Sequence, residues 1–221
     1  MQATLFGQQE PALDPLFRRA SRIHLDVMSW VDRVPGWVQG HQRLFEQLRE
    51  QVHWRTQRRP MYDRIVEVPR LLGTVSSGTV SSATVSPATV SSGIAATDRT
   101  PPILRAMSRA LTERYGEPLD AITLALYRDG QDSVAWHADQ VLRDMPSAVV
   151  AVVSLGGERK FMVRPARGGE SRSWSIGWGD LMVMGGACQR RWHHAVPKQR
   201  HAEPRMAVMF RNRTLRPDTP R

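Results

Sequence analysis

Two residue types that bind metal ions stand two positions apart near the middle of the chain. His137 and Asp139 end the segment YRDGQDSVAWHAD, which begins at Tyr127. A two-residue step along an extended strand places both side chains on one face, so the two can share an ion. A further histidine in RRWHHAVPK, at position 193 or 194, follows far enough along the chain to complete a set of three ligands.

Two histidines and one carboxylate bind one face of a divalent ion and leave the other positions open, as in non-haem iron(II) oxygenases. An isolated H-x-D triplet, however, arises by chance in a chain with 7 histidines and 21 acidic residues. The prediction of a metal centre therefore depends on the rest of the sequence.

A segment near the C-terminus predicts a binding site for an anion. In PRMAVMFR, residues 204–211, period-two alternation places Arg205 and Arg211 on one face with only Ala207 and Met209 between them. Guanidinium groups are rarely buried without a partner and match carboxylates in shape, so an inward-facing pair indicates a small dicarboxylate. Because six residues of strand span about 20 Å, the arginines must lean inward or the strand must curve. The alternative is an edge strand whose arginines face solvent or phosphate.

Three segments of the chain resemble the AlkB-type iron(II)- and 2-oxoglutarate-dependent dioxygenases, in particular the actinobacterial branch and the human DNA-repair homologues. The segments are LALYRDGQDSVAWHAD, GDLMVMGGACQRRWHHAVPKQRHAEPR and PRMAVMFR. The resemblance covers about residues 54 to 213, and the metal residues, the arginine pair and the connecting strands occur in the order of the family. It implies that the protein uses Fe(II), 2-oxoglutarate as co-substrate, and O2.

The resemblance also implies which residues bind the iron. The ligands would be His137, Asp139 and His194. His194 is preferred to His193 because the family pattern has tryptophan, any residue, then the ligand histidine, and Trp192 fixes that register.

The same resemblance places the co-substrate. Arg205 would bind the remote carboxylate of 2-oxoglutarate with help from the hydroxyl of Tyr127, and Arg211 would lie nearer to the carboxylate at the metal. The chain departs from the family at Ala125 and Ala207, where many members have asparagines that contact the co-substrate. Each loss removes a neutral hydrogen bond worth roughly 0.5 to 1.5 kcal/mol, which weakens binding of 2-oxoglutarate but keeps the charged contacts.

Recognition of a nucleic-acid base is predicted for residues 54–72, because Met61 to Leu72 resembles the nucleotide-recognition region of the family. The candidates for contact with the substrate are Tyr62, Trp54, Arg64 and Arg70. Tyr62 is the first choice for a ring that stacks on an extruded base and Trp54 the second, and the alternative for each is a place in the core.

Two departures concern the substrate side. The acid that often follows the H-x-D aspartate and touches the damaged base is missing, and Gln140 and Val141 stand there instead. Residues 74–93 form successive five-residue units, TVSSG, TVSSA, TVSPA and TVSSG. Such a Ser/Thr-rich tract has too little apolar surface to offset its ordering entropy, so we expect a mobile low-complexity loop inserted in the domain.

Charge and composition indicate the partner and the compartment. The net charge is +10, from 31 basic and 21 acidic residues, and such an excess favours phosphate backbones through counterion release. We expect DNA as partner, single-stranded or with a flipped base; the alternative is a surface of solvated arginines. One cysteine, Cys188, excludes an internal disulfide and suits a reducing cytosol. With neither a signal segment nor a long apolar run, we expect a cytoplasmic protein that does not span a membrane. We also expect a monomer.

Periodicity predicts the architecture. Apolar residues at helical spacing indicate helices at 41–54 and 101–115. Short β-type runs, separated by turn-rich segments, follow at 122–127, 149–155, 160–165, 173–176, 181–184 and 205–211. Short strands after two helices predict an α+β fold, a double-stranded β-helix or jelly roll with N-terminal buttressing helices. We expect one dioxygenase domain at 14–213, a flexible N-terminus at 1–13 and a basic tail at 214–221.

The resemblance implies oxidative demethylation of 1-methyladenine and 3-methylcytosine in DNA. The methyl group would be hydroxylated and leave as formaldehyde, while 2-oxoglutarate would be decarboxylated to succinate. One alternative is an AlkB-like dioxygenase that acts on RNA or protein. The other is a non-catalytic module that binds damaged DNA.

The first residues carry a separate hypothesis. Gln2 to Phe6, QATLF, resembles the Q-x-x-L-F peptides by which bacterial repair proteins bind the sliding clamp. The alternative is a disordered end or a strand packed on the domain.

Overall fold

The computed structural model of the chain describes residues 9–61, 64–75, 100–139, 142 and 145–212. Several sequence predictions fall outside this part of the chain. They concern the peptide Gln2 to Phe6, Tyr62, Gln140 and Val141, the tail at 214–221 and the repeat tract from residue 76 onward.

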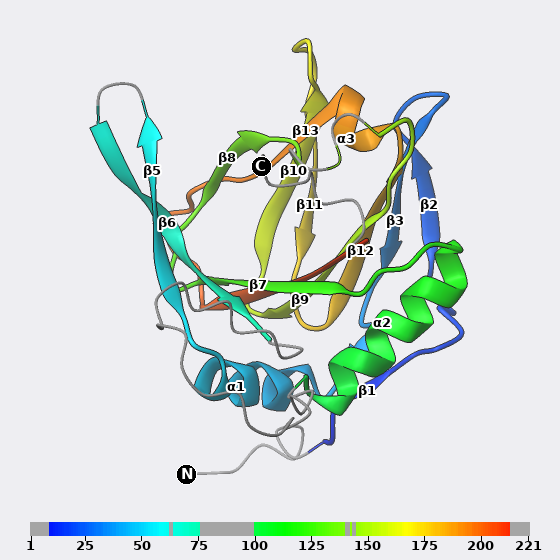
Figure 1. Cartoon of the computed structure of the whole chain (residues 1–221), viewed down its shortest axis with the longest axis vertical. Helices are drawn as coiled ribbons and strands as arrows, with labels where there is room; N and C mark the ends of the chain where they lie inside the picture. The colour runs from blue at the N-terminus through cyan, green and yellow to red at the C-terminus, as the bar shows by residue number, and fades with distance from the viewer. Residues whose placement is uncertain (1–8, 62–63, 76–99, 140–141, 143–144, 213–221) are drawn as a thin grey trace, which may run out of the picture.

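Two antiparallel β-sheets face one another (Figure 1). The strands of the large sheet are, in spatial order, β2 (Ser21–His24), β3 (Ser29–Val34), β12 (Asp180–Gly186), β9 (Val150–Gly156), β14 (Arg205–Arg211), β7 (Ala121–Tyr127), β6 (Arg64–Thr74) and β5 (Arg55–Met61). Those of the small sheet are β11 (Arg172–Ile176), β10 (Arg159–Pro165), β13 (Trp192–Val196) and β8 (Val134–His137). A separate pair joins β1 (Ala12–Leu13) to β4 (Val38–Gln39).

Three helices lie in the described part of the chain: α1 (His41–Gln51), α2 (Pro102–Tyr115) and α3 (Cys188–Arg191). The first two bury apolar stripes at helical spacing, Leu44, Phe45 and Leu48 in α1 and Leu104, Met107 and Leu111 in α2. α2 starts with a proline, which suits the first helical position, and ends at Gly116, whose φ of 72° suits a left-handed cap.

The large sheet separates two apolar clusters. The outer cluster joins α1 and α2 to one face of that sheet, and the inner cluster lies between the two sheets. Strand β14 shows the division: Met206, Val208 and Phe210 belong to the outer cluster, whereas Ala207 belongs to the inner one. In Figure 1 both helices lie outside the sheets, where they support the large sheet from its outer face.

The predicted fold class is confirmed: an α+β jelly roll with buttressing helices. Each of the predicted strands begins and ends within two residues of an observed one, and α1 stops at Gln51, before the predicted end at 54. The sequence reading missed the hairpin of β2 and β3 and the long hairpin of β5 and β6. Within the described residues, no helix is long and apolar enough to cross a membrane.

Candidate metal centre

Two histidines from neighbouring strands of the small sheet face one another. His194 of β13 pairs in register with His137 of β8, and their ring centroids lie 4.2 Å apart. His194 also stacks on Phe161, at 5.7 Å between centroids. The structure thus places His194, the preferred histidine, next to His137. His193 comes one position earlier in the strand and pairs with Arg164.

Both histidines are held in the form that binds metal. Nδ1 of His137 lies 2.8 Å from the carbonyl oxygen of Ala135. Because a carbonyl only accepts, Nδ1 carries the proton and Nε2 keeps its lone pair. Burial lowers the pKa of His137 below its ordinary value, and it lowers the pKa of His194 further, with added repulsion from His137 and Arg211. Two neutral imidazoles at pH 7 are the form that a divalent ion requires.

Asp139 lies next to this pair but not on the strand. β8 ends at His137, so the expected shared strand face does not include Asp139, and that explanation of the H-x-D spacing is wrong. Oδ2 of Asp139 lies 2.7 Å from Nε of Arg211, an ion pair without the alignment of a hydrogen bond. Among the described residues, no three of the His, Cys, Asp and Glu side chains form a closed metal cluster. The donor types therefore fit iron(II), while the carboxylate is paired with an arginine.

The other arginine of the predicted pair, Arg205, is buried between the sheets. Arg205 is 1% exposed, and its Nε donates to Oγ of Ser154 at 2.6 Å. It pairs in register with Tyr127, whose ring centroid lies 5.2 Å from the guanidinium carbon. Burial lowers the pKa of Arg205 to about 10, against the opposing effect of Tyr127, so the group keeps its charge at pH 7.

One atom of this guanidinium has no partner. Nη2 of Arg205 is buried and donates to no hydrogen-bond acceptor within the described part of the chain. A buried charged donor without a partner costs free energy that folding alone does not recover. A carboxylate placed between the sheets would satisfy it. The observation fits the predicted site for the remote carboxylate of 2-oxoglutarate.

The scan against protein families matches residues 34–216 to the 2OG-Fe(II) oxygenase superfamily. The chain belongs to this superfamily. Its members use Fe(II), 2-oxoglutarate and O2, so the histidine pair and the unsatisfied arginine have the chemistry that the family requires.

Curated relatives of this superfamily member are AlkB homologues. It is 35% identical over 131 residues to human "Alpha-ketoglutarate-dependent dioxygenase alkB homolog 3", a match that covers 53% of this chain and 44% of the relative. It is 30% identical over 138 residues to "DNA oxidative demethylase ALKBH2" of Arabidopsis thaliana, covering 52% and 44%. The matches thus span less than half of the relatives' length.

The comparison with solved structures finds weaker similarities. An oxidoreductase of the 2OG-Fe(II) oxygenase family from Burkholderia pseudomallei shares 14% identity at a TM-score of 0.46, over 76% of each chain. A prolyl hydroxylase from Trichoplax adhaerens shares 11% identity at a TM-score of 0.48, over 79% of this chain and 77% of that one.

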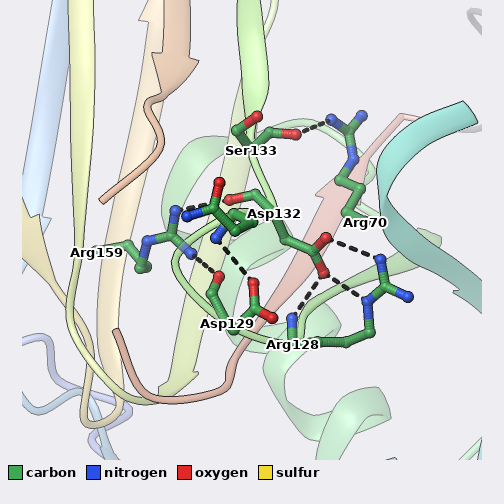
Figure 2. Close-up of polar contacts among 7 residues, drawn as sticks. Arg70, Arg128, Asp129, Asp132, Ser133 and Arg159 are labelled. Atoms are coloured by element: carbon green, nitrogen blue, oxygen red, sulfur yellow. Dashed lines mark hydrogen bonds and ion pairs between the residues drawn. The ribbon is translucent and has the colours of Figure 1, made fainter. Parts of the chain in front are cut away.

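A buried polar network surrounds Arg159, whose guanidinium carbon lies 5.5 Å from the ring centroid of Tyr127. The fully buried Arg159 donates to the backbone oxygens of Asp129 and Asp132 at 2.9 and 2.7 Å (Figure 2). It also donates to the backbone oxygen of Pro197 at 2.9 Å and to Oε1 of Gln199 at 2.8 Å. The network ties the loop between β7 and β8 to the loop before β14.

The sequence reading missed Arg159 and its neighbours. Asp132 accepts two hydrogen bonds from the guanidinium of Arg128, at 2.8 and 2.9 Å (Figure 2). A signal for Arg159 was present, because alternation in β10 places it on the same face as the buried Phe161 and Val163. An arginine at an inward position of a strand demands partners, and here the backbone supplies them.

The substrate candidates are only partly brought to the site. Arg70 of β6 lies close enough for its charge to lower the pKa of both His137 and His194, and its Nη1 lies 3.5 Å from the carbonyl oxygen of Ser133 (Figure 2). Trp54 does not reach the site: its Nε1 donates to the carbonyl oxygen of Arg49, and its ring packs on the outer cluster.

The two positions that depart from the family face each other. Ala125 of β7 pairs in register with Ala207 of β14, and both are buried in the inner cluster. The wall beside Arg205 is therefore apolar here.

The side chain of Arg64, the remaining substrate candidate on β6, lies outside the part of the chain that the structure describes.

Proposed function

We propose that this chain is an iron(II)- and 2-oxoglutarate-dependent dioxygenase that removes methyl groups from 1-methyladenine and 3-methylcytosine in DNA. Two observations carry the proposal: the buried guanidinium of Arg205 has an N–H donor without a partner among the described residues, and two neutral histidines of the small sheet face one another. When bound, iron(II) with 2-oxoglutarate and O2 supplies the oxidation of the methyl group, which leaves as formaldehyde while the co-substrate becomes succinate and carbon dioxide.

The residues of the chain bind and orient the reactants. His137, Asp139 and His194 hold the metal, and Arg211 lies next to it through its ion pair with Asp139. Arg205 binds the remote carboxylate of 2-oxoglutarate with the hydroxyl of Tyr127.

The apolar walls at Ala125 and Ala207 exclude water from the co-substrate. They leave its polar contacts to the charged groups, which we expect to give weaker binding of 2-oxoglutarate than a wall of amides would.

DNA is the proposed substrate on two grounds. The net charge of +10 favours a polyanion, and a relative carries the name DNA oxidative demethylase. Arg70 lies close enough to the histidine pair to lower the pKa of both rings, and Tyr62 and Arg64 complete the proposed contacts with an extruded base. The proposed unit is a cytoplasmic monomer whose catalytic domain spans 14–213, of the actinobacterial branch.

Turnover of a methylated oligonucleotide tests the proposal. Purified protein with Fe(II), ascorbate and 2-oxoglutarate should release formaldehyde and form succinate with single-stranded DNA that contains 1-methyladenine, and His137→Ala should not. Faster turnover of methylated RNA or of a methylated peptide would replace the DNA proposal by the RNA or protein alternative. Tight binding of methylated DNA without succinate formation would favour the non-catalytic damage-binding module.

A clamp contact is proposed separately, from the sequence alone. The peptide Gln2 to Phe6 would bind the hydrophobic pocket of a sliding clamp through Leu5 and Phe6. A pull-down with purified clamp should retain the wild-type chain and lose the variant Leu5→Ala/Phe6→Ala. Equal retention of both would remove the hypothesis and leave the catalytic proposal unaffected.

A further inference from the structure

The position of Asp139 is fixed by contacts other than those of a β-strand. Since β8 ends at His137, the alternation of a strand does not fix the direction of the next carboxylate. The backbone of Asp139 makes two hydrogen bonds instead. Its carbonyl accepts from the N–H of Leu142 at 3.0 Å, and its own N–H donates to Oε1 of Gln189 at 3.0 Å. The second bond joins residues 50 positions apart in sequence.

Gln189 lies in a segment that is firmly held. Its side chain is buried, with 2% of the residue exposed, in the short helix α3. The N–H groups of Arg190 and Arg191 both donate to the carbonyl of Ala187 at 3.0 Å, which closes the turn. Trp192, the first residue of β13, donates from Nε1 to Oδ2 of Asp26 at 2.9 Å. The segment that carries Gln189 therefore runs directly into the strand that carries His194.

The amide of Gln189 has one strong partner. Its oxygen accepts from the N–H of Asp139, while its Nε2 donates, among the described residues, to the thioether of Met184 at 3.9 Å. Sulfur is a weak acceptor, so the hydrogen bond with the N–H of Asp139 is the one that offsets most of the free-energy cost of burying the amide. The two bonds also fix which end of the amide faces Asp139, because the oxygen cannot donate and the nitrogen cannot accept.

We propose that Gln189 is a positioning residue of the metal centre: its amide joins the segment carrying His194 to the turn carrying Asp139. The inference rests on the proposed function, since it gives Asp139 a place among the metal ligands. Removing a residue that orients a metal ligand by hydrogen bonding typically lowers metal affinity by about 10- to 100-fold. Gln189 orients its ligand through the backbone, at the point where the strand no longer does so.

Three variants separate positioning from packing. Gln189→Met keeps the volume of the side chain and removes the acceptor for the N–H of Asp139. Gln189→Glu keeps an acceptor oxygen. Met184→Leu is the matched control, because it removes the sulfur at the other end of the same amide and leaves the bond to Asp139 in place.

The readout is the dissociation constant for Mn(II), a redox-stable probe, measured by calorimetry on the full chain without substrate. We expect Gln189→Met to weaken binding of Mn(II) by about 10- to 100-fold, Gln189→Glu to recover part of that loss, and Met184→Leu to bind as the wild type does. The melting temperature of the apo protein should fall more in Gln189→Met than in Met184→Leu, because Gln189→Met removes the stronger of the two hydrogen bonds. Amide exchange in the wild type should show protection at Asp139, although it lies outside a strand.

The outcomes distinguish the two proposals. If the wild type binds Mn(II) and Gln189→Met binds it equally well, the positioning role is overturned and the metal centre stands. Equal weakening of Mn(II) binding in Met184→Leu would show that Gln189 contributes through packing alone. Fast amide exchange at Asp139 in the wild type would show that the hydrogen bond to Gln189 is not formed, and this test holds even if Gln189→Met does not fold. A wild type that binds no Mn(II) would overturn the metal centre and the role of Gln189 together.

Discussion

The two faces of strand β14 differ in whether their buried groups find partners within the protein. On the outer face, Met206, Val208 and Phe210 are fully buried against α1, α2 and the neighbouring strands. On the inner face, Arg205 and Arg211 stand at the ends of the strand. Nη2 of Arg205 is buried without a hydrogen-bond partner among the described residues, and Nε of Arg211 has only its ion pair with Asp139. One strand thus contributes to a closed core on one side and to an incomplete polar site on the other.

The difference shows which face serves stability and which serves binding. Burial of apolar side chains stabilises the fold without further conditions. A buried donor without a partner lowers stability, so natural structures keep few of them and those few call for an explanation. At the inner face, the proposed explanation for Arg205 is an anionic ligand, and for Arg211 it is the carboxylate of Asp139, a proposed metal ligand. Substitutions on the two faces should therefore affect different measurements.

The largest effect is expected at the metal ligands. His194→Ala removes one of the two facing imidazoles, and iron(II)-dependent formation of succinate should fall to background. The circular dichroism spectrum and the melting temperature of the apo protein check that the fold is retained. Residual turnover close to the wild-type rate would show that the histidine pair does not hold the metal.

A large effect of a different kind is expected on the outer face. Phe210→Ala leaves a cavity between the sheet and its helices, and it should lower the free energy of unfolding by about 3 to 5 kcal/mol. Urea denaturation measures this loss. The dissociation constant for 2-oxoglutarate, measured at a temperature where the variant is folded, should stay as in the wild type. A parallel loss of 2-oxoglutarate binding would break the separation of the two faces.

On the inner face, Arg205→Met should weaken binding and spare the fold. Hydrogen bonds to charged groups contribute about 1.5 to 3 kcal/mol, which corresponds to a rise of about 10- to 150-fold in the dissociation constant for 2-oxoglutarate. The apo protein should be no less stable than the wild type, because an unsatisfied buried cation is replaced by an apolar chain and Ser154 keeps a contact to the carbonyl of Ile176 at 3.3 Å. Unchanged 2-oxoglutarate binding would mean that the co-substrate lies elsewhere.

The smallest effect is expected at Tyr127. Tyr127→Phe removes a hydroxyl and keeps the ring beside Arg205, so it should raise the dissociation constant for 2-oxoglutarate by about 2- to 10-fold, as for one neutral hydrogen bond. Calorimetric titration resolves such a change. A loss as large as that of Arg205→Met would indicate that the hydroxyl, and not the guanidinium, is the main contact.

Local periodicity was sufficient for much of the fold. The alternation in PRMAVMFR predicted both faces of β14, and the apolar spacing in α1 and α2 predicted their buried sides. Periodicity reports how one segment lies relative to a core. It does not report which distant segment lies opposite.

The parts that sequence reasoning missed depend on such distant contacts. Gln189 supports Asp139 across 50 positions, and Ser154 meets Arg205 across 51, and no local pattern indicates either partner. Asp139 was placed on a strand because the spacing allowed it, but β8 ends two residues earlier. Trp54 was a candidate for base stacking by residue type, whereas its contacts place it on the outer cluster.

Anaerobic titration with iron(II) and 2-oxoglutarate tests the inner-face site most directly. Joint binding at one centre should give the weak visible charge-transfer band of an iron(II)–2-oxoglutarate complex in the wild type. The band should be absent in His194→Ala, and in Arg205→Met it should require more 2-oxoglutarate. Absence of the band in folded wild-type protein, or a band that persists in His194→Ala, would contradict the account.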